Sequence, residues 1–249
     1  MLAPAEIAKF SISVAEKKAK LPAFKMLLLG TFAGAFIALA ATAATFGNFY
    51  VGKLAGACIF PAGLAMVIIA GSELFTGNCL MLTALFSKKI KLRQLLKNWG
   101  LVFLGNFIGS MLVVLMVVYS GVFDNIADIV MTTANNKINL GFGESFLRGV
   151  LCNILVCTAV WMAFAAETVP GKIIAVFFPV MVFVLCGFEH SIANMFYVPA
   201  GILESVKMGG AGIDFGAFLG CNLLPVTLGN IVGGAGLVAG GYYLTYLKK

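Results

Sequence analysis

An eight-residue frame, Gly-x-Glu-x-x-x-x-Asn, occurs twice in this chain, each time inside an apolar segment long enough to cross a bilayer. It reads GSELFTGN at 71–78 and GFEHSIAN at 187–194. A carboxylate in lipid is costly, so Glu73 and Glu189 indicate functional sites by default. Backbone groups freed by a helix break inside a bilayer must be paired by protein or by a water-lined cavity. The repeated frame therefore predicts two broken helices that line a polar path through a membrane.

The composition is that of a polytopic membrane protein. Hydrophobic residues make up 61% of the 249 residues and charged residues 11%, with a mean hydropathy of +1.03, which excludes a soluble domain. A transmembrane helix needs about 17–25 mostly apolar residues. Six such segments are predicted, the second and fifth broken at the two glutamates, at 26–46, 59–85, 98–123, 146–165, 173–202 and 222–247.

Lysine and arginine positions predict the orientation, because cytoplasmic connections carry an excess of both. With both termini in the cytoplasm, only four of the 17 basic residues lie outside, namely Lys53, Lys137, Arg148 and Lys207. The net charge of +7 therefore reflects topology and does not indicate nucleic acid binding. We expect a multi-pass protein of the cell inner (cytoplasmic) membrane.

Residues 1–25 carry five lysines and no long apolar core. They are therefore predicted to form a cytoplasmic surface helix with Ile7, Phe10 and Val14 as its apolar stripe.

A second pair of motifs indicates an internal repeat. GNFIGS at 105–110 recurs as GNIVGG at 229–234, in the same order relative to the two glutamate frames. Three spans per repeat is an odd number, so the second copy must enter the membrane in the opposite sense. The predicted fold is an all-α integral membrane protein, a single transmembrane domain over 1–249 with an inverted 3+3 repeat. The N-terminal helix is followed by a first repeat at 26–123 and a second at 144–249.

The two glutamates have two possible roles. Each can accept hydrogen bonds from the helix start that follows it and so brace the break. Alternatively, each faces the permeating species, which would suit a cation or proton path and repel an anion.

His190 is the only histidine of the chain and directly follows Glu189. Its ordinary pKa of about 6.5 allows a charge change near neutrality. A protonated ring at mid-membrane would attract a small anion, or would give a proton to the conjugate base of a weak acid. The alternative is a neutral, hydrogen-bonded core histidine.

Thr76 occupies the corresponding break in the first repeat and offers a hydroxyl that donates or accepts. Leu74 and Phe75 beside it add apolar bulk, which can form a constriction that resists hydrated ions.

The remaining motifs do not indicate catalysis or a bound metal. The six cysteines lie singly in apolar stretches without a CxxC, one histidine excludes a His-rich zinc site, and neither HExxH nor GxSxG occurs. We expect no cofactor and no catalytic residues.

These segments resemble the formate/nitrite transporter family. The resemblance rests on GSELFTGN and GFEHSIANMF, and extends to GVLCNILVCTAVW at 149–161, NMFYVPAG at 194–201 and NLLPVTLGNIVG at 222–233. It implies an aquaporin-like, six-span protomer with a pore through each subunit of a homopentamer, passing small monovalent anions.

Matching positions imply a polar station between two apolar constrictions. Thr76 and His190 would form the station, Asn153 would line the pore, and Lys137 would draw anions towards the outer vestibule. One constriction would consist of Phe60, Leu64 and Phe183, and the other of Leu74, Phe75 and Val156.

The predicted function is a passive or proton-linked channel for anions of weak acids such as formate, hydrosulfide and nitrite. Which anion is physiological, and whether the protein is a channel or a proton-coupled carrier, stay open. A neutral-solute channel resembling aquaporins is the nearest alternative, although no NPA triplet is present. An intramembrane enzyme built on Glu189 and His190 is more distant, since neither has a visible nucleophile or metal partner.

Overall fold

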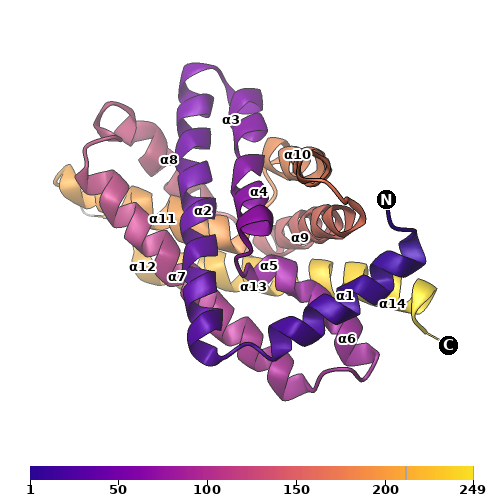
Figure 1. Ribbon diagram of the computed structural model, residues 1–249. Coiled ribbons are helices and arrows are strands. Elements are labelled where there is room, and N and C mark those ends of the chain that lie inside the picture. Colours follow the sequence, from indigo (N-terminus) through magenta and orange to yellow (C-terminus); the bar gives the residue numbers. More distant parts are fainter. Residues whose placement is uncertain (211, 249) are drawn as a thin grey trace.

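The computed structural model describes residues 1–210 and 212–248, and within these residues all regular elements are helical (Figure 1). The first half contains α1 (Pro4–Ala19), α2 (Ala23–Tyr50), α3 (Lys53–Ile59), α4 (Pro61–Ala70), α5 (Phe75–Asn78), η1 (Cys79–Met81), α6 (Leu82–Phe86) and α7 (Leu92–Tyr119). The second half contains η2 (Asp124–Ile126), α8 (Ala127–Ile138), α9 (Phe142–Ala165), α10 (Val169–Cys186), α11 (Ser191–Lys207), α12 (Phe215–Ala217), η3 (Phe218–Leu223), α13 (Leu224–Ile231), η4 (Val232–Ala239) and α14 (Gly240–Tyr246). Here η1 and η2 are 3₁₀ turns, and η3 and η4 are π-helical.

Six segments of the described chain are long and apolar enough to cross a membrane, as predicted. They are α2, α3 with α4, α7, α9, α10, and the run from α12 to α14. Several helices begin before the predicted span because charged first turns are still helical. The α7 helix, for example, begins at Leu92 and is capped by Gln94, whose Oε1 accepts from the N–H of Lys91 at 2.8 Å. The short helix α8, which lies between the two predicted repeats, was not predicted.

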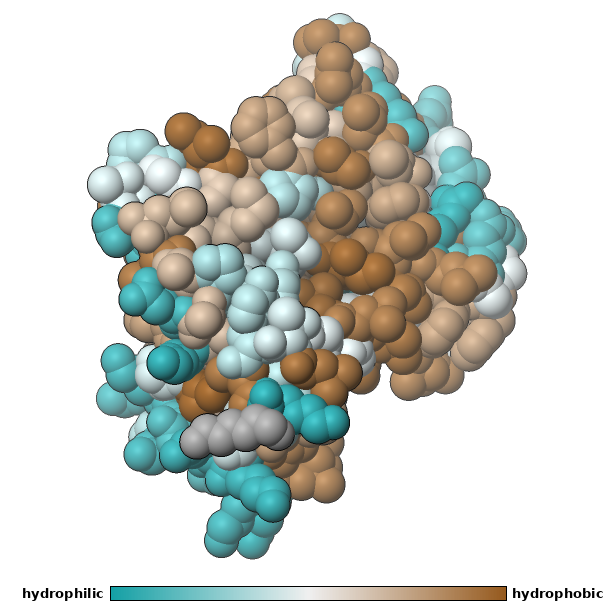
Figure 2. Space-filling view, turned by 90° about the vertical axis from the view of Figure 1, so that its right-hand side faces the viewer, coloured by the Kyte–Doolittle hydropathy of each residue, from teal (hydrophilic) through white to brown (hydrophobic). Residues whose placement is uncertain are grey.

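The α2 helix has an outward apolar stripe and an inward stripe of small residues. Phe24, Leu28 and Phe32 are 71%, 40% and 47% exposed. Gly30 and Gly34 on the opposite side are buried against α7. Figure 2 shows that apolar side chains cover a continuous area of one face, with hydrophilic residues gathered at its edges. Such a surface suits lipid or neighbouring subunits.

The chain leaves the helical conformation at both glutamate frames. The α4 helix ends at Ala70 and is followed by Gly71 with φ 78°, and α10 ends at Cys186 and is followed by Gly187 with φ 72°. This left-handed conformation favours glycine and ends a helix. The next helical residues are Phe75 in the first half and Ser191 in the second. The inversion of one half relative to the other stays a prediction.

The N-terminal helix α1 packs on the protein more closely than a surface helix would. Ile7, Ala8 and Ala15 are buried, and the Ser11 hydroxyl lies 3.2 Å from that of Thr83 in α6. Phe10 of the predicted stripe is 42% exposed, and its ring packs edge-on against that of Phe164 in α9, with the centroids 5.5 Å apart. The small buried residues of α1 allow it to approach α6 and α9 closely.

Candidate functional site

The first break is held by the side chain of one asparagine from α7. Asn106 Nδ2 donates to the carbonyl oxygens of Gly30 and Glu73, at 2.8 and 2.9 Å. Its Oδ1 accepts from the N–H of Phe75 at 3.0 Å. The N–H of Glu73 donates to the carbonyl of Leu29 at 3.2 Å. One amide and one carbonyl from neighbouring helices therefore pair the backbone groups that the break sets free.

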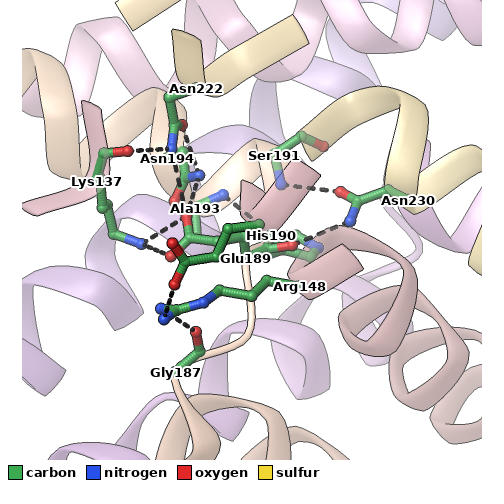
Figure 3. A network of polar contacts seen from close by, with 11 residues as sticks. Lys137, Arg148, Gly187, Glu189, His190, Ser191, Ala193, Asn194, Asn222 and Asn230 are labelled. Carbon is green, nitrogen blue, oxygen red and sulfur yellow. Dashed lines mark hydrogen bonds and ion pairs between the residues drawn. The ribbon is translucent and has the colours of Figure 1, made fainter. Parts of the chain in front are cut away.

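The second break repeats this arrangement on α13 (Figure 3). Asn230 Nδ2 donates to the carbonyl oxygens of Gly149 and Glu189, at 2.8 and 3.0 Å. Its Oδ1 accepts from the N–H of Ser191 at 2.9 Å. The N–H of Glu189 donates to the carbonyl of Arg148 at 3.3 Å. The two halves thus use the same contacts, and both asparagines follow the glycine of the repeated Gly-Asn motif.

The carboxylate of Glu73 contacts side chains and accepts no hydrogen bond from the helix start. It is 5% exposed, and it accepts from Asn78 Nδ2 at 2.7 Å and lies 2.9 Å from Lys18 Nζ. Asn78 in turn bonds to Asn98 at 2.8 Å. The prediction that Glu73 braces the break required backbone N–H groups to donate to its carboxylate. The N–H of Phe75 donates to Asn106 Oδ1 instead.

Glu189 has the corresponding partners. It is 3% exposed, accepts from Asn194 Nδ2 at 2.6 Å, and its two carboxylate oxygens lie 2.8 and 3.0 Å from Lys137 Nζ. Asn194 bonds to Asn222 at 2.7 Å. Figure 3 shows the lysine and the amides converging on this carboxylate. Lys137, the predicted anion attractor, is therefore also the counter-ion of Glu189.

Three cavities follow one another between the halves. A first vestibule of about 230 Å³ lies on the α1 side and reaches Leu64 and Leu74. A second vestibule of about 150 Å³ lies on the α8 side and reaches Phe60, Phe183 and His190. All of these residues also line a narrow cavity of about 10 Å³. Its lining therefore includes residues of both vestibules, and it has room for about one water molecule.

Five of the six residues of the two predicted constrictions line this one narrow cavity. Phe60 and Phe183 form the end towards the second vestibule, with ring centroids 5.8 Å apart at 82°. Leu64 lies with Leu74 at the other end. Val156 lines the same cavity.

Phe75, Thr76 and Asn153 do not line any of these three cavities, so His190 is the member of the predicted polar station that does. Phe75 packs edge-on against Phe103 and Trp99, at centroid distances of 5.0 and 5.9 Å. Asn153 is fully buried and donates to the carbonyl of Thr76 at 3.2 Å. Their predicted places in the pore wall stay predictions.

The structure brings Thr76 and His190 together from opposite halves. Thr76 Oγ1 lies 2.9 Å from His190 Nε2. The N–H of Ala193 donates to His190 Nδ1 at 3.1 Å, so the imidazole caps the start of α11. Because Nδ1 is an acceptor, the neutral ring carries its proton on Nε2 and donates it to the Thr76 hydroxyl. A second proton on Nδ1 would displace the capping bond.

Comparison with known proteins identifies the family. The model of the family described as formate/nitrite transporter matches residues 5–244. The chain belongs to this family. The formate/nitrite transporter family consists of membrane transport proteins, so the chain is a multi-pass transporter and not an enzyme.

Individual relatives of the family cover nearly the whole chain. A "Probable formate transporter" of Methanothermobacter thermautotrophicus is 39% identical, over 99% of this chain and 97% of its own length. The "Formate channel FocA" of Haemophilus influenzae is 37% identical, over 100% and 95%. A solved structure described as "Pentameric formate channel with formate bound" has a TM-score of 0.81 at 38% identity, covering 91% of this chain and 98% of that chain.

The sequence did not predict the roles of Asn106, Asn230 and Lys18 in the site. Asn106 and Asn230 lie in the repeated Gly-Asn motif, so the repeat itself was the available signal. Lys18 gave no such signal, because its contact with Glu73 depends on how α1 packs.

Proposed function

We propose that this chain is a channel for formate and similar small anions of weak acids. The observation that carries the proposal is the series of three cavities whose narrowest part is lined by His190. His190 is also in hydrogen-bond contact with Thr76. Related proteins described as formate channels support formate as the first substrate to test.

The narrow cavity explains why a polar group such as His190 is needed in its wall. An ion that enters a space of about 10 Å³ loses its hydration shell, which is costly between apolar side chains. Thr76 has a hydroxyl proton to offer because its oxygen already accepts from His190 Nε2. A neutral hydrogen-bond donor can stabilise an anion without binding it as tightly as a fixed positive charge would. For the anion of a weak acid, taking up a proton from solution would further reduce the free-energy cost of dehydration.

Each vestibule also presents a lysine. Lys18 lines the first vestibule and Lys137 the second, and each is paired with a glutamate. The pairs keep the buried carboxylates of Glu73 and Glu189 neutralised, so these carboxylates repel an approaching anion less.

We further propose a homopentamer in the cytoplasmic membrane, with α1 and both termini on the cytoplasmic side. The described resemblance to a pentameric channel supports the assembly. The distribution of lysine and arginine supports the orientation.

Uptake into proteoliposomes tests the proposal directly. We expect uptake of formate that nitrite and hydrosulfide inhibit competitively, measured at two pH values. Osmotic swelling in glycerol serves as the comparison. Swelling in glycerol without formate uptake would favour the aquaporin-like alternative and contradict an anion channel.

Replacing Thr76 with valine is expected to lower formate flux by about 10–100-fold. The substitution keeps the shape but removes a hydrogen bond to a charged ligand, worth about 1.5–3 kcal/mol. Thr76→Ser keeps the hydroxyl and is expected to retain most of the flux. Equal flux in the valine and serine variants would show that the hydroxyl does not serve the anion.

Replacing His190 with asparagine is expected to remove the pH dependence of formate flux. Asparagine is a good helix N-cap, so the start of α11 keeps an acceptor while the titratable ring is lost. The measurement is initial uptake rate against pH for both proteins. If the variant retained the wild-type profile, His190 would have no part in proton transfer.

A further inference from the structure

The carbonyl of Thr76 has an unusual set of donors. The helix changes from α5 to the 3₁₀ turn η1, and the N–H of Cys79 donates to this carbonyl three residues back. Two side chains of α9 also reach it, Asn153 Nδ2 at 3.2 Å and Cys157 Sγ at 3.3 Å. A 3₁₀ stretch within a helical run often marks a functional position. The backbone of Thr76 is therefore held from the other half of the molecule.

The two α9 side chains are themselves fixed by packing. Both Asn153 and Cys157 are fully buried, and Asn153 Nδ2 also donates to the carbonyl of Asn230 at 2.7 Å. Gly234 of the π-helical segment η4 closes over them. A Cβ at this glycine would lie 2.3 Å from Asn153 Nδ2 and 2.7 Å from Cys157 Sγ. There is little room for the thiol to turn away from Thr76.

The equivalent helix of the first half, α2, has no pair of side-chain donors like Asn153 and Cys157. Gly30 and Gly149 occupy equivalent places, because each accepts the same bond from Asn106 or Asn230. Counting from them, the counterparts of Asn153 and Cys157 on α2 are a glycine and an alanine, neither of which has a side-chain donor. The contact of Asn153 and Cys157 with the Thr76 carbonyl is therefore additional to the asparagine contacts that the two halves share. It occurs only at the break where Thr76 contacts His190.

We propose that Cys157 is a positioning residue that acts through Thr76. Its thiol donates to the Thr76 carbonyl and fixes the first turn of α5, so that the hydroxyl stays within hydrogen-bond reach of His190 Nε2. The inference rests on the proposed anion channel, because it assigns a supporting residue to the same polar station. It gives the thiol a role that a buried apolar cysteine would not have.

The test compares Cys157→Ala with Cys157→Ser in proteoliposomes. Serine restores a donor, whereas alanine does not. We expect formate flux to fall by about three- to tenfold in the alanine variant, as for one lost hydrogen bond, and to stay within about twofold in the serine variant. The pH profile of the alanine variant should shift as well, because the Thr76–His190 contact is loosened. Cys152→Ala, a buried thiol on the same helix, is the matched control and should keep its flux.

An infrared measurement separates this role from simple packing. The S–H stretch of Cys157, isolated as the difference between wild type and Cys157→Ser, should lie at the lower frequency of a bonded thiol. An unbonded S–H band, an alanine variant with wild-type flux, or a serine variant as impaired as alanine would each overturn the proposal. If the wild type carried no formate, the proposed function would fail, and the infrared band alone would decide whether the thiol holds Thr76.

Discussion

Replacing Asn230 with leucine is expected to abolish transport and to cost about 2–6 kcal/mol of stability. Leucine has a similar volume but pairs neither the carbonyl of Glu189 nor the N–H of Ser191, which now lie 3.0 and 2.9 Å from the amide. Each buried backbone group left without a partner costs about 1–3 kcal/mol. Domains are commonly stable by only about 5–15 kcal/mol, so this loss is large. Thermal unfolding in detergent and formate uptake are the measurements.

Asn139→Leu is the matched control. Asn139 is exposed, and its side chain donates only to the carbonyl of Asn135 at 2.9 Å. We expect a change within about 0.5 kcal/mol there. A small effect at Asn230 as well would mean that the break does not depend on the amide.

Among glycine-to-alanine substitutions in α7, Gly109→Ala is expected to reduce the stability of the protein most. A Cβ at this position would lie 1.9 Å from the carbonyl oxygen of Thr31 and 2.8 Å from the N–H nitrogen of Ala35. Both contacts are backbone atoms of α2, so the two helices must separate. Overpacking usually costs about 1–3 kcal/mol, and a backbone contact belongs at the upper end or beyond. Separation would also weaken the bond from Asn106 to Gly30, at 2.8 Å, which supports the first break.

Gly100→Ala on the same helix should change stability in the opposite direction. A Cβ there meets nothing within 4 Å. Alanine is favoured over glycine within a helix by about 0.5–1 kcal/mol, so we expect a small rise in the unfolding temperature. Equal effects at Gly100 and Gly109 would contradict close packing as the cause.

The sequence predicted the features that depend on local patterns. The six apolar segments lie where their length and composition placed them. Gly71 and Gly187 mark the ends of α4 and α10, because the left-handed conformation there suits glycine. The family assignment from the two frames was also correct.

Other features depend on how the helices pack, which local patterns do not specify. The contact of Phe10 with Phe164, for example, exists only because α1 packs on α9. Whether the two predicted constrictions are separate is another such feature, because Phe60, Leu64 and Phe183 line the same narrow cavity as Leu74 and Val156.

The sequence alone determined that this protein has six segments apolar enough to cross a membrane, where the helical conformation is interrupted at the two glutamate frames, and which family it belongs to. Hydrophobic length, glycine and a repeated glutamate act within short stretches, so they can be read along the chain. Tertiary structure alone decided which atoms pair at the breaks. Asn106 reaches a carbonyl 76 residues away, and Thr76 reaches His190 across 114 residues. Such contacts exist only after the helices pack, because hydrogen bonds require ångström-scale placement that no local pattern specifies.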